Sequence, residues 1–145
     1  MRAGGRCRPP GEGGTAVIVG VGTDLVAVQR LRAACERRPS LRARLFSEEE
    51  WECARQGEAV HWERLAGFFA AKEAALKALG TGLRGGEFRE VRVGHGQGGQ
   101  PRLSMEGRAA ETAARLGVRR WLVSISHTAG MAVAVVLAEG ADAGD

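Results

Sequence analysis

The segment 62–80 reads WERLAGFFAAKEAALKALG, and it decides the fold. Alanines recur every four residues from Ala66 to Ala78, which places a stripe of small side chains on one face of a helix. Such a stripe lets another element approach closely, while the leucines and phenylalanines between the alanines supply apolar bulk. The pattern therefore predicts one long helix over 62–79 that stops at Gly80.

The regions on either side of this helix predict the strands of an antiparallel sheet. Residues 16–22 form a β-branched run that ends in glycines, 121–126 alternate, and 131–138 are almost wholly apolar, like a central strand. Shorter elements are expected as helices from residue 27 until Pro39, from the capping box at 47–50 and over 105–116, and as strands at 90–93 and 101–104. The fold class is α+β: an antiparallel sheet packed against one long helix plus shorter helices.

Length and composition indicate a single globular domain, because 145 residues that are 44% hydrophobic can bury a core. We expect a disordered Gly/Pro/Arg-rich leader at 1–15, the folded domain at 16–139 and a flexible acidic tail at 140–145. No apolar run is long enough to span a membrane. The three cysteines are widely spaced and lack any CxxC pair, which predicts reduced thiols and a cytoplasmic protein.

The chain is basic, with a net charge of +4, and this charge suits an acidic partner or a phosphorylated ligand. Of its 21 basic side chains only Lys72 and Lys77 are lysines, and both lie on the long helix around Glu73. A lysine ammonium is a compact donor whose chemistry arginine does not reproduce, so these positions are candidates for function. Lys72 lies on another face of the helix from Lys77, so the two lysines do not serve one site, and a contact with a bound ligand or with a neighbouring subunit stays open for Lys72.

Asp24, Glu73 and Lys77 are the candidate reaction centre. Asp24 is expected just past the first strand, and Glu73 and Lys77 are one helical turn apart. Two purely structural interpretations stay open. Asp24 can be a helix N-terminal carboxylate, and Glu73 and Lys77 can form a surface ion pair that stabilises the helix by about 0.2–0.5 kcal/mol. Together, however, the two carboxylates suit Mg²⁺ with a substrate phosphate, and Lys77 suits the charge on that phosphate.

Ser126, His127 and Thr128 follow a predicted strand and precede a turn. Two hydroxyls and an imidazole at a strand end can hold phosphate oxygens, although a lone histidine there is more often a capping or core residue. A serine-hydrolase interpretation is poor, because no GxSxG elbow exists and adjacent strand residues point to opposite faces.

In this order along the chain, the signals resemble the holo-acyl-carrier-protein synthase family, the short 4′-phosphopantetheinyl transferases. The match spans about residues 18–138 and rests on several blocks in sequence order. These are GVGTDLV at 20–26 with Arg30, LFSEEE at 45–50, RLAG at 64–67 leading into FAAKEA at 69–74, KALGTG at 77–82, GQP at 99–101 and SISHT at 124–128.

The resemblance implies transfer of 4′-phosphopantetheine from coenzyme A to a serine of apo acyl carrier protein, releasing adenosine 3′,5′-bisphosphate, a step of fatty acid biosynthesis. By similarity, Asp24 and Glu73 hold Mg²⁺, Lys77 contacts the phosphates, and Glu73 or a metal-bound water takes the serine proton. The implied coenzyme A contacts are Lys77, Gly80, Gly82, Pro101, Ser126, His127 and Thr128.

The family forms homotrimers with sites between subunits, so the resemblance implies that His127 serves a neighbour's site. Arg30 matches the position that meets the acidic carrier protein, and nearby arginines extend that basic face. Neither nucleic acid nor a membrane is expected as a partner. One departure concerns Phe68, where the family usually has arginine; Arg64 and Arg84 are candidates to supply that charge.

Two alternatives belong to other classes. An arginine-rich module that binds RNA or another acidic polymer explains the high pI but leaves Asp24, Glu73 and Lys77 unexplained. A degenerate homologue that binds carrier protein without catalysis is favoured only by Phe68.

Overall fold

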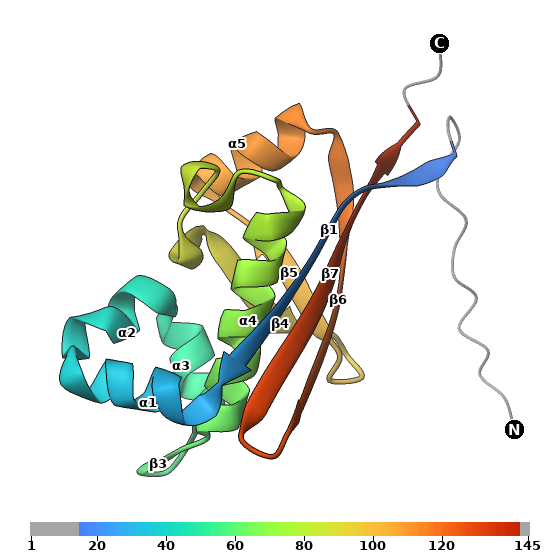
Figure 1. Cartoon of the computed structure of the whole chain (residues 1–145). Coiled ribbons are helices and arrows are strands. Elements are labelled where there is room, and N and C mark those ends of the chain that lie inside the picture. Colours follow the sequence, from blue (N-terminus) through green and yellow to red (C-terminus); the bar gives the residue numbers. More distant parts are fainter. Residues whose placement is uncertain (1–14, 143–145) are drawn as a thin grey trace, which may run out of the picture.

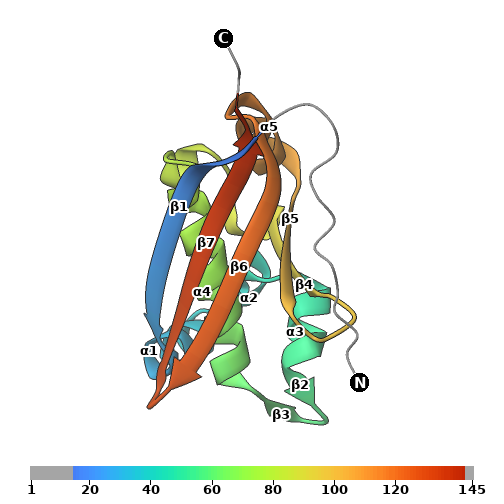
Figure 2. The ribbon, with the colours of Figure 1, turned by 90° about the vertical axis from the view of Figure 1, so that its right-hand side faces the viewer.

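The computed structural model describes residues 15–142 and centres on one helix packed across one sheet (Figures 1 and 2). The helix is α4 (Trp62–Ala78), and the three-stranded antiparallel sheet has the order β1 (Ala16–Ala27), β7 (Met131–Ala141) and β6 (Val118–Thr128). The long helix, its stop before Gly80 and the central position of the last strand are confirmed. So is the α+β class.

Smaller elements gather at the two ends of α4. Helices α1–α3 lie at one end and α5 near the other, with the hairpin of β4 and β5 alongside (Figure 1). Their bounds are α1 (Val28–Arg37), α2 (Pro39–Leu45), α3 (Glu48–Ala54), β2 (Arg55–Gln56), β3 (Ala59–Val60), β4 (Val91–His95), β5 (Pro101–Met105) and α5 (Gly107–Arg115), with 3-10 turns η1 (Gly82–Arg84) and η2 (Phe88–Glu90). Among residues 15–142, no helix combines the length and the apolarity needed to cross a membrane.

The strand β1 and the helix α4 are in close contact, and this contact fixes the positions of the residues that lie between them. The four alanines of the stripe are all buried, as expected. Two of them face glycines: a Cβ on Gly22 would overlap the carbonyl oxygen of Ala74, and a Cβ on Gly20 would overlap that of Ala78. The backbone of the strand therefore lies directly on the backbone of the helix, with no side chain between them.

The predicted capping box is present, and it belongs to a larger buried network. The Ser47 side chain accepts from the Glu50 amide at 3.2 Å, and the Glu50 carboxylate accepts from the Ser47 amide at 2.8 Å. Glu50 also pairs with Lys72 at 2.7 Å, and the Lys72 side chain is fully buried. The contact of Lys72 with a bound ligand or a neighbouring subunit, left open by the sequence, is wrong, because burial inside its own chain removes it from any surface.

Several predicted boundaries also need correction. The chain does break at Pro39, but a further helix, α2, begins there because proline is well tolerated at the first helical position. The predicted tail at 140–145 begins too early, since Gly140 and Ala141 continue β7 and pair with β1. At the other end, the Thr15 carbonyl accepts from the Asp142 amide at 3.0 Å. The rest of the predicted leader lies outside the described residues.

Replacing Gly22 with alanine should lower the free energy of unfolding by about 1–3 kcal/mol, because the added methyl group must push the strand off the helix. Urea unfolding measures this change. Gly94→Ala is the matched control: a Cβ there meets no atom within 4 Å, so its stability should stay within about 1 kcal/mol of the wild type. Equal stability of the two variants would contradict the close packing.

Candidate active site

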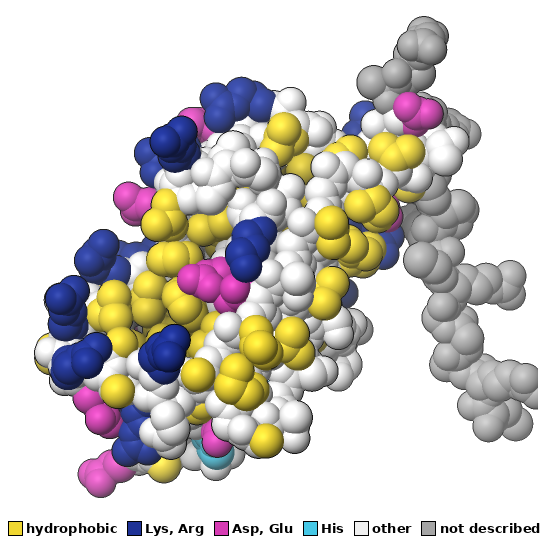
Figure 3. Space-filling view, in the orientation of Figure 1, with side chains coloured by type: hydrophobic (Ala, Val, Ile, Leu, Met, Phe, Trp, Pro, Cys, Tyr) yellow, Lys and Arg dark blue, Asp and Glu magenta, His cyan; other side chains and the backbone are white. Residues whose placement is uncertain are grey.

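Asp24, Glu73 and Lys77 come together in one hollow, as predicted. Asp24 projects from β1, and the other two side chains project from successive turns of α4. Figure 3 shows an acidic cluster beside basic side chains on this face, with apolar side chains around it. The hollow is further lined by Leu76, Gly82, Leu83 and Phe88.

Lys77 pairs with Asp24, and neither of the two purely structural interpretations of these residues holds. The Lys77 ammonium lies 3.0 Å from Asp24 Oδ1 and donates to the Thr23 carbonyl at 3.0 Å. The ion pairs among residues 15–142 include no Glu73–Lys77 pair, which removes the interpretation of these two residues as a surface ion pair. Asp24 is not a helix-end carboxylate either, since it lies within β1 opposite Ala134 on β7.

The Glu73 carboxyl is held against Asp24, and this contact changes its acidity. Burial, the largest cause, together with the adjacent Asp24 carboxyl, raises the pKa of Glu73 to about 8, although Lys77 opposes the shift. Two carboxylates at close range resist double ionisation unless a cation lies between them. The pair therefore holds a proton at neutral pH or exchanges it for a positive ligand.

The donors of this hollow fit Mg²⁺. Asp24 Oδ2 is buried and has no hydrogen-bond partner among the described residues, so it is free to act as a ligand. Residues 15–142 contain no cluster of three or more His, Cys, Asp or Glu side chains arranged for a metal. A two-carboxylate site is what Mg²⁺ uses when waters and substrate phosphates complete its coordination.

The other predicted coenzyme A contacts do not gather in this hollow. Only Gly82 lines it, and Gly80 occupies the exposed turn after α4 with a φ of 75°. Pro101 lines a separate hollow between β5 and β6. Ser126, His127 and Thr128 are exposed at the end of β6 and line a third hollow with Leu25 and Met131. Within one chain, the predicted site is therefore divided.

Arg30 lies on a groove that leads to the same carboxylate pair. This groove is lined by apolar side chains from β1, α1 and α2 and shares Glu73 and Phe88 with the reaction hollow. Of the arginines expected to extend the basic face, Arg32 is paired with Glu36 and Arg42 lies over the Trp51 ring. Arg37, Arg38 and Arg44 are exposed.

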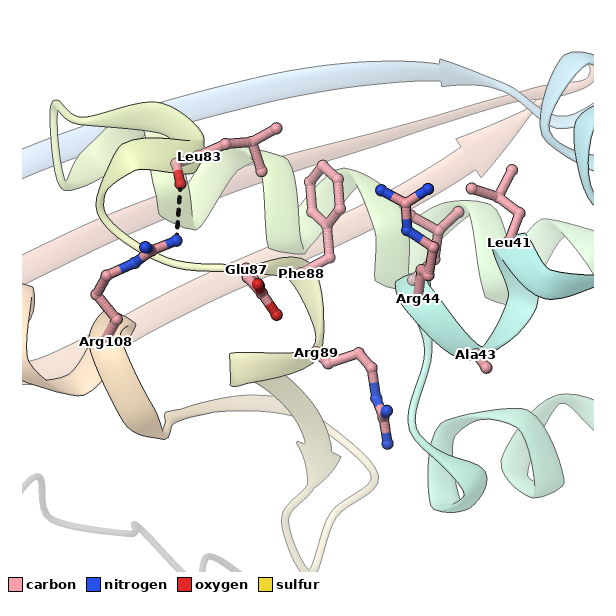
Figure 4. Close-up of a pocket in the computed structure, with 9 residues that line it drawn as sticks. Leu41, Ala43, Arg44, Leu83, Glu87, Phe88, Arg89 and Arg108 are labelled. Atoms are coloured by element: carbon pink, nitrogen blue, oxygen red, sulfur yellow. Dashed lines mark hydrogen bonds between the residues drawn. The ribbon is translucent and has the colours of Figure 1, made fainter.

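Phe88 is the residue that sequence reasoning missed. It lines the reaction hollow, the Arg30 groove and a further hollow bounded by Arg44, Arg89 and Arg108, where Figure 4 shows it between Leu83 and Arg44. A single aromatic after the Gly80–Gly86 turn was a weak signal, because nothing in the sequence placed that turn against Glu73.

Phe68, the predicted departure, is a core residue. Its side chain is buried and its ring lies 5.7 Å from that of His95. Of the two candidates to replace the missing arginine, Arg64 donates to the Cys53 carbonyl at 2.8 Å, and Arg84 lies exposed in η1.

The chain is similar in sequence to proteins of one family. A family model described as the 4′-phosphopantetheinyl transferase superfamily matches residues 20–136. The holo-[acyl-carrier-protein] synthase of Streptomyces coelicolor is 49% identical over 123 residues, which are 85% of this chain and 98% of the relative. That of Caldanaerobacter subterraneus is 39% identical over 122 residues, 84% of this chain and 95% of the relative.

Solved structures give the same result. The holo-[acyl-carrier-protein] synthase of Neisseria meningitidis superposes with a TM-score of 0.75 at 31% identity, covering 84% of this chain and 98% of that one. The Helicobacter pylori enzyme in complex with coenzyme A superposes with a TM-score of 0.71 at 28% identity, covering 81% of this chain and 98% of that one. The chain therefore belongs to the holo-acyl-carrier-protein synthase family of the 4′-phosphopantetheinyl transferase superfamily.

Proposed function

We propose that the protein is a holo-acyl-carrier-protein synthase that transfers 4′-phosphopantetheine from coenzyme A to a serine of apo acyl carrier protein. One observation carries this: two carboxyl groups and a lysine ammonium meet in a single hollow, with one buried carboxylate oxygen unpartnered. An RNA-binding module has no use for this arrangement. A degenerate homologue would not need to keep it intact.

The reaction is a phosphoryl transfer, which depends mainly on positioning and charge. The serine oxygen forms a bond to the phosphorus nearer the pantetheine, and the bond from that phosphorus to the bridging oxygen breaks. The leaving adenosine 3′,5′-bisphosphate takes the electron pair. Mg²⁺, held by Asp24 and Glu73, would offset the negative charge of the pyrophosphate.

The side chains of the hollow supply the remaining chemistry. The Glu73 carboxylate would take the serine proton as a general base, since it lies in the same hollow as Asp24 and Lys77. Lys77 contacts the phosphates, because its ammonium is exposed to the hollow while Asp24 fixes its position. Gly82 borders the same space and brings backbone close to the substrate.

A homotrimer with sites between subunits accounts for the divided coenzyme A contacts. The sheet face turned away from α4 exposes Val21 at 62%, Leu25 at 63% and Val135 at 42%, an apolar surface suited to burial against other copies. Pro101 and the 126–128 segment of one copy would then complete the hollow of another. Sedimentation should give a trimer, and a monomer at assay concentrations would contradict this.

Arg30 and its groove suit an acidic helical carrier protein, whose serine would approach Glu73 from that side. We place the protein in the cytoplasm, as reduced cysteines and use of coenzyme A favour, and cell fractionation tests this.

Mass spectrometry of apo acyl carrier protein tests the function directly. Incubation with the enzyme, coenzyme A and Mg²⁺ should add one phosphopantetheine arm to the carrier. An unchanged mass would refute the proposal, and salt-sensitive binding of RNA instead would favour the alternative class.

Asp24→Ala should lower the rate of transfer at least about a hundredfold, because it removes one of two metal ligands and the partner of Lys77. Initial rates at saturating Mg²⁺ measure the effect. Glu111→Ala on α5 removes an exposed carboxylate that does not line the hollow and should leave the rate unchanged. An Asp24→Ala enzyme as fast as this control would refute the metal assignment.

Lys77→Arg should lower kcat about tenfold or more although it keeps the charge, because a planar guanidinium cannot replace the ammonium between Asp24 and the phosphates. Steady-state kinetics measure kcat. The reverse exchange at an exposed site, Arg115→Lys on α5, is the control and should have no effect. Turnover by Lys77→Arg near that of the wild type would mean that the position needs only a positive charge.

Mg²⁺ binding should strengthen as pH rises from about 6 to about 8 and then level off. Because the pKa of Glu73 is raised to about 8 without metal, the cation must displace a proton below that pH, which weakens it by about tenfold per pH unit. Calorimetric titration of the protein with Mg²⁺ measures this slope. Glu73→Gln should bind more weakly with little slope, and a steep slope in that variant would contradict the assignment.

A further inference from the structure

Lys72 is fully buried, and each of its three ammonium hydrogens has an acceptor. Its Nζ lies 2.7 Å from Glu50 Oε1 and donates to the carbonyl oxygens of Phe88 at 3.0 Å and Val91 at 2.7 Å. Burial lowers the pKa of Lys72, and the adjacent Glu50 opposes that shift. A tetrahedral donor matches three acceptors around one point, which a flat guanidinium does not.

The carboxylate of Glu50, the partner of Lys72, also has several hydrogen-bond donors. Besides Lys72, Glu50 accepts from the amide of Ser47 at 2.8 Å and from that of Val93 at 2.8 Å. The pair thus ties α4 to the start of α3, to the 3-10 turn η2 and to β4. Stability alone is a weak reason for such a pair, since apolar residues of similar volume often serve as well.

The two carbonyl groups that Lys72 holds lie at the two ends of η2. Phe88 is the first residue of that turn and Val91 follows its last. The Phe88 ring packs edge-on against Phe69 at 5.2 Å and lines the reaction hollow, the Arg30 groove and the hollow of Figure 4. It is therefore the shared wall between the phosphate side of the site and the side that the carrier serine approaches.

We propose that Lys72 is a positioning residue for the transfer reaction, which it supports through Phe88. Its ammonium anchors η2 to the same helix that carries Glu73, so the aromatic wall and the carboxylate keep a fixed relation. This inference rests on the proposed function, and Lys72 itself touches neither substrate.

Kinetics of three variants test the coupling. Lys72→Met and Phe88→Ala should each lower kcat/KM for the carrier protein by about tenfold to a hundredfold, since a wall displaced by an ångström misplaces the serine. Because Lys72 acts through Phe88, the double variant should be no worse than the more impaired single variant. If the two losses multiply instead, the residues act independently and the proposal is overturned.

Two controls separate positioning from stability. Leu65→Ala removes a fully buried side chain from the opposite end of α4, and it should lower stability while kcat/KM per folded molecule stays near that of the wild type. Where Lys72→Met does not fold, Lys72→Met with Glu50→Gln leaves no unpaired buried charge, and Phe88→Ala is then added to that background. An equal loss of kcat/KM in Leu65→Ala would show that Lys72 only stabilises the fold, and it would overturn the proposal.

Amide hydrogen exchange gives a readout that needs no activity. Exchange in the segment 86–91 should be faster in Lys72→Met than in Leu65→Ala at matched global stability, because only the first loses the anchor of η2. Equal exchange in the two variants would overturn the proposal. A wild type that transfers nothing to carrier protein would refute the proposed function and leave this test of the anchor standing.

Discussion

The close approach of β1 to α4 is the constraint on which the site depends. Gly20 and Gly22 place strand backbone directly against the carbonyls of Ala78 and Ala74. Two residues further along β1, on the same face of the sheet, stands Asp24, which meets Glu73 and Lys77 on the turns of the helix that carry Ala74 and Ala78. A larger side chain at either glycine would separate the Asp24 carboxylate from Glu73. The geometry of the reaction hollow therefore depends on the packing of the core.

The two lysines of this arginine-rich chain serve that geometry in different ways. Lys77 is exposed at the hollow and neutralises Asp24, which leaves an ammonium facing the place where phosphate would bind. Lys72, buried on another face of the same helix, holds the turn that carries Phe88. Both positions need a compact cation with several donors, and in both the neighbouring backbone carbonyl is an acceptor.

Periodicity and capping were enough to predict α4, the capping box at Ser47 and the approximate places of the longer strands, because these patterns are local in sequence. They did not predict β2 and β3, and they ended β1 before Asp24, which lies inside it. The meeting of Asp24, Glu73 and Lys77 was inferred from their chemistry and supported by the family resemblance, since no local pattern states which strand crosses which helix. The pairing of Lys77 with Asp24, the burial of Lys72 and the place of Phe88 depend on contacts between residues more than 15 positions apart, and sequence patterns do not encode such contacts. Phe68 was counted among the apolar bulk of the helix, and its burial agrees with that prediction.

We propose that the carboxylates of Asp24 and Glu73 share a divalent cation with the pyrophosphate of coenzyme A. A crystal structure of the protein with coenzyme A and Mn²⁺, a Mg²⁺ substitute visible by anomalous scattering, tests it most directly. We expect one anomalous peak at about 2.0–2.2 Å from an oxygen of each carboxylate and from the phosphates. Bound coenzyme A with no peak between Asp24 and Glu73, or with a cation held elsewhere, would contradict it.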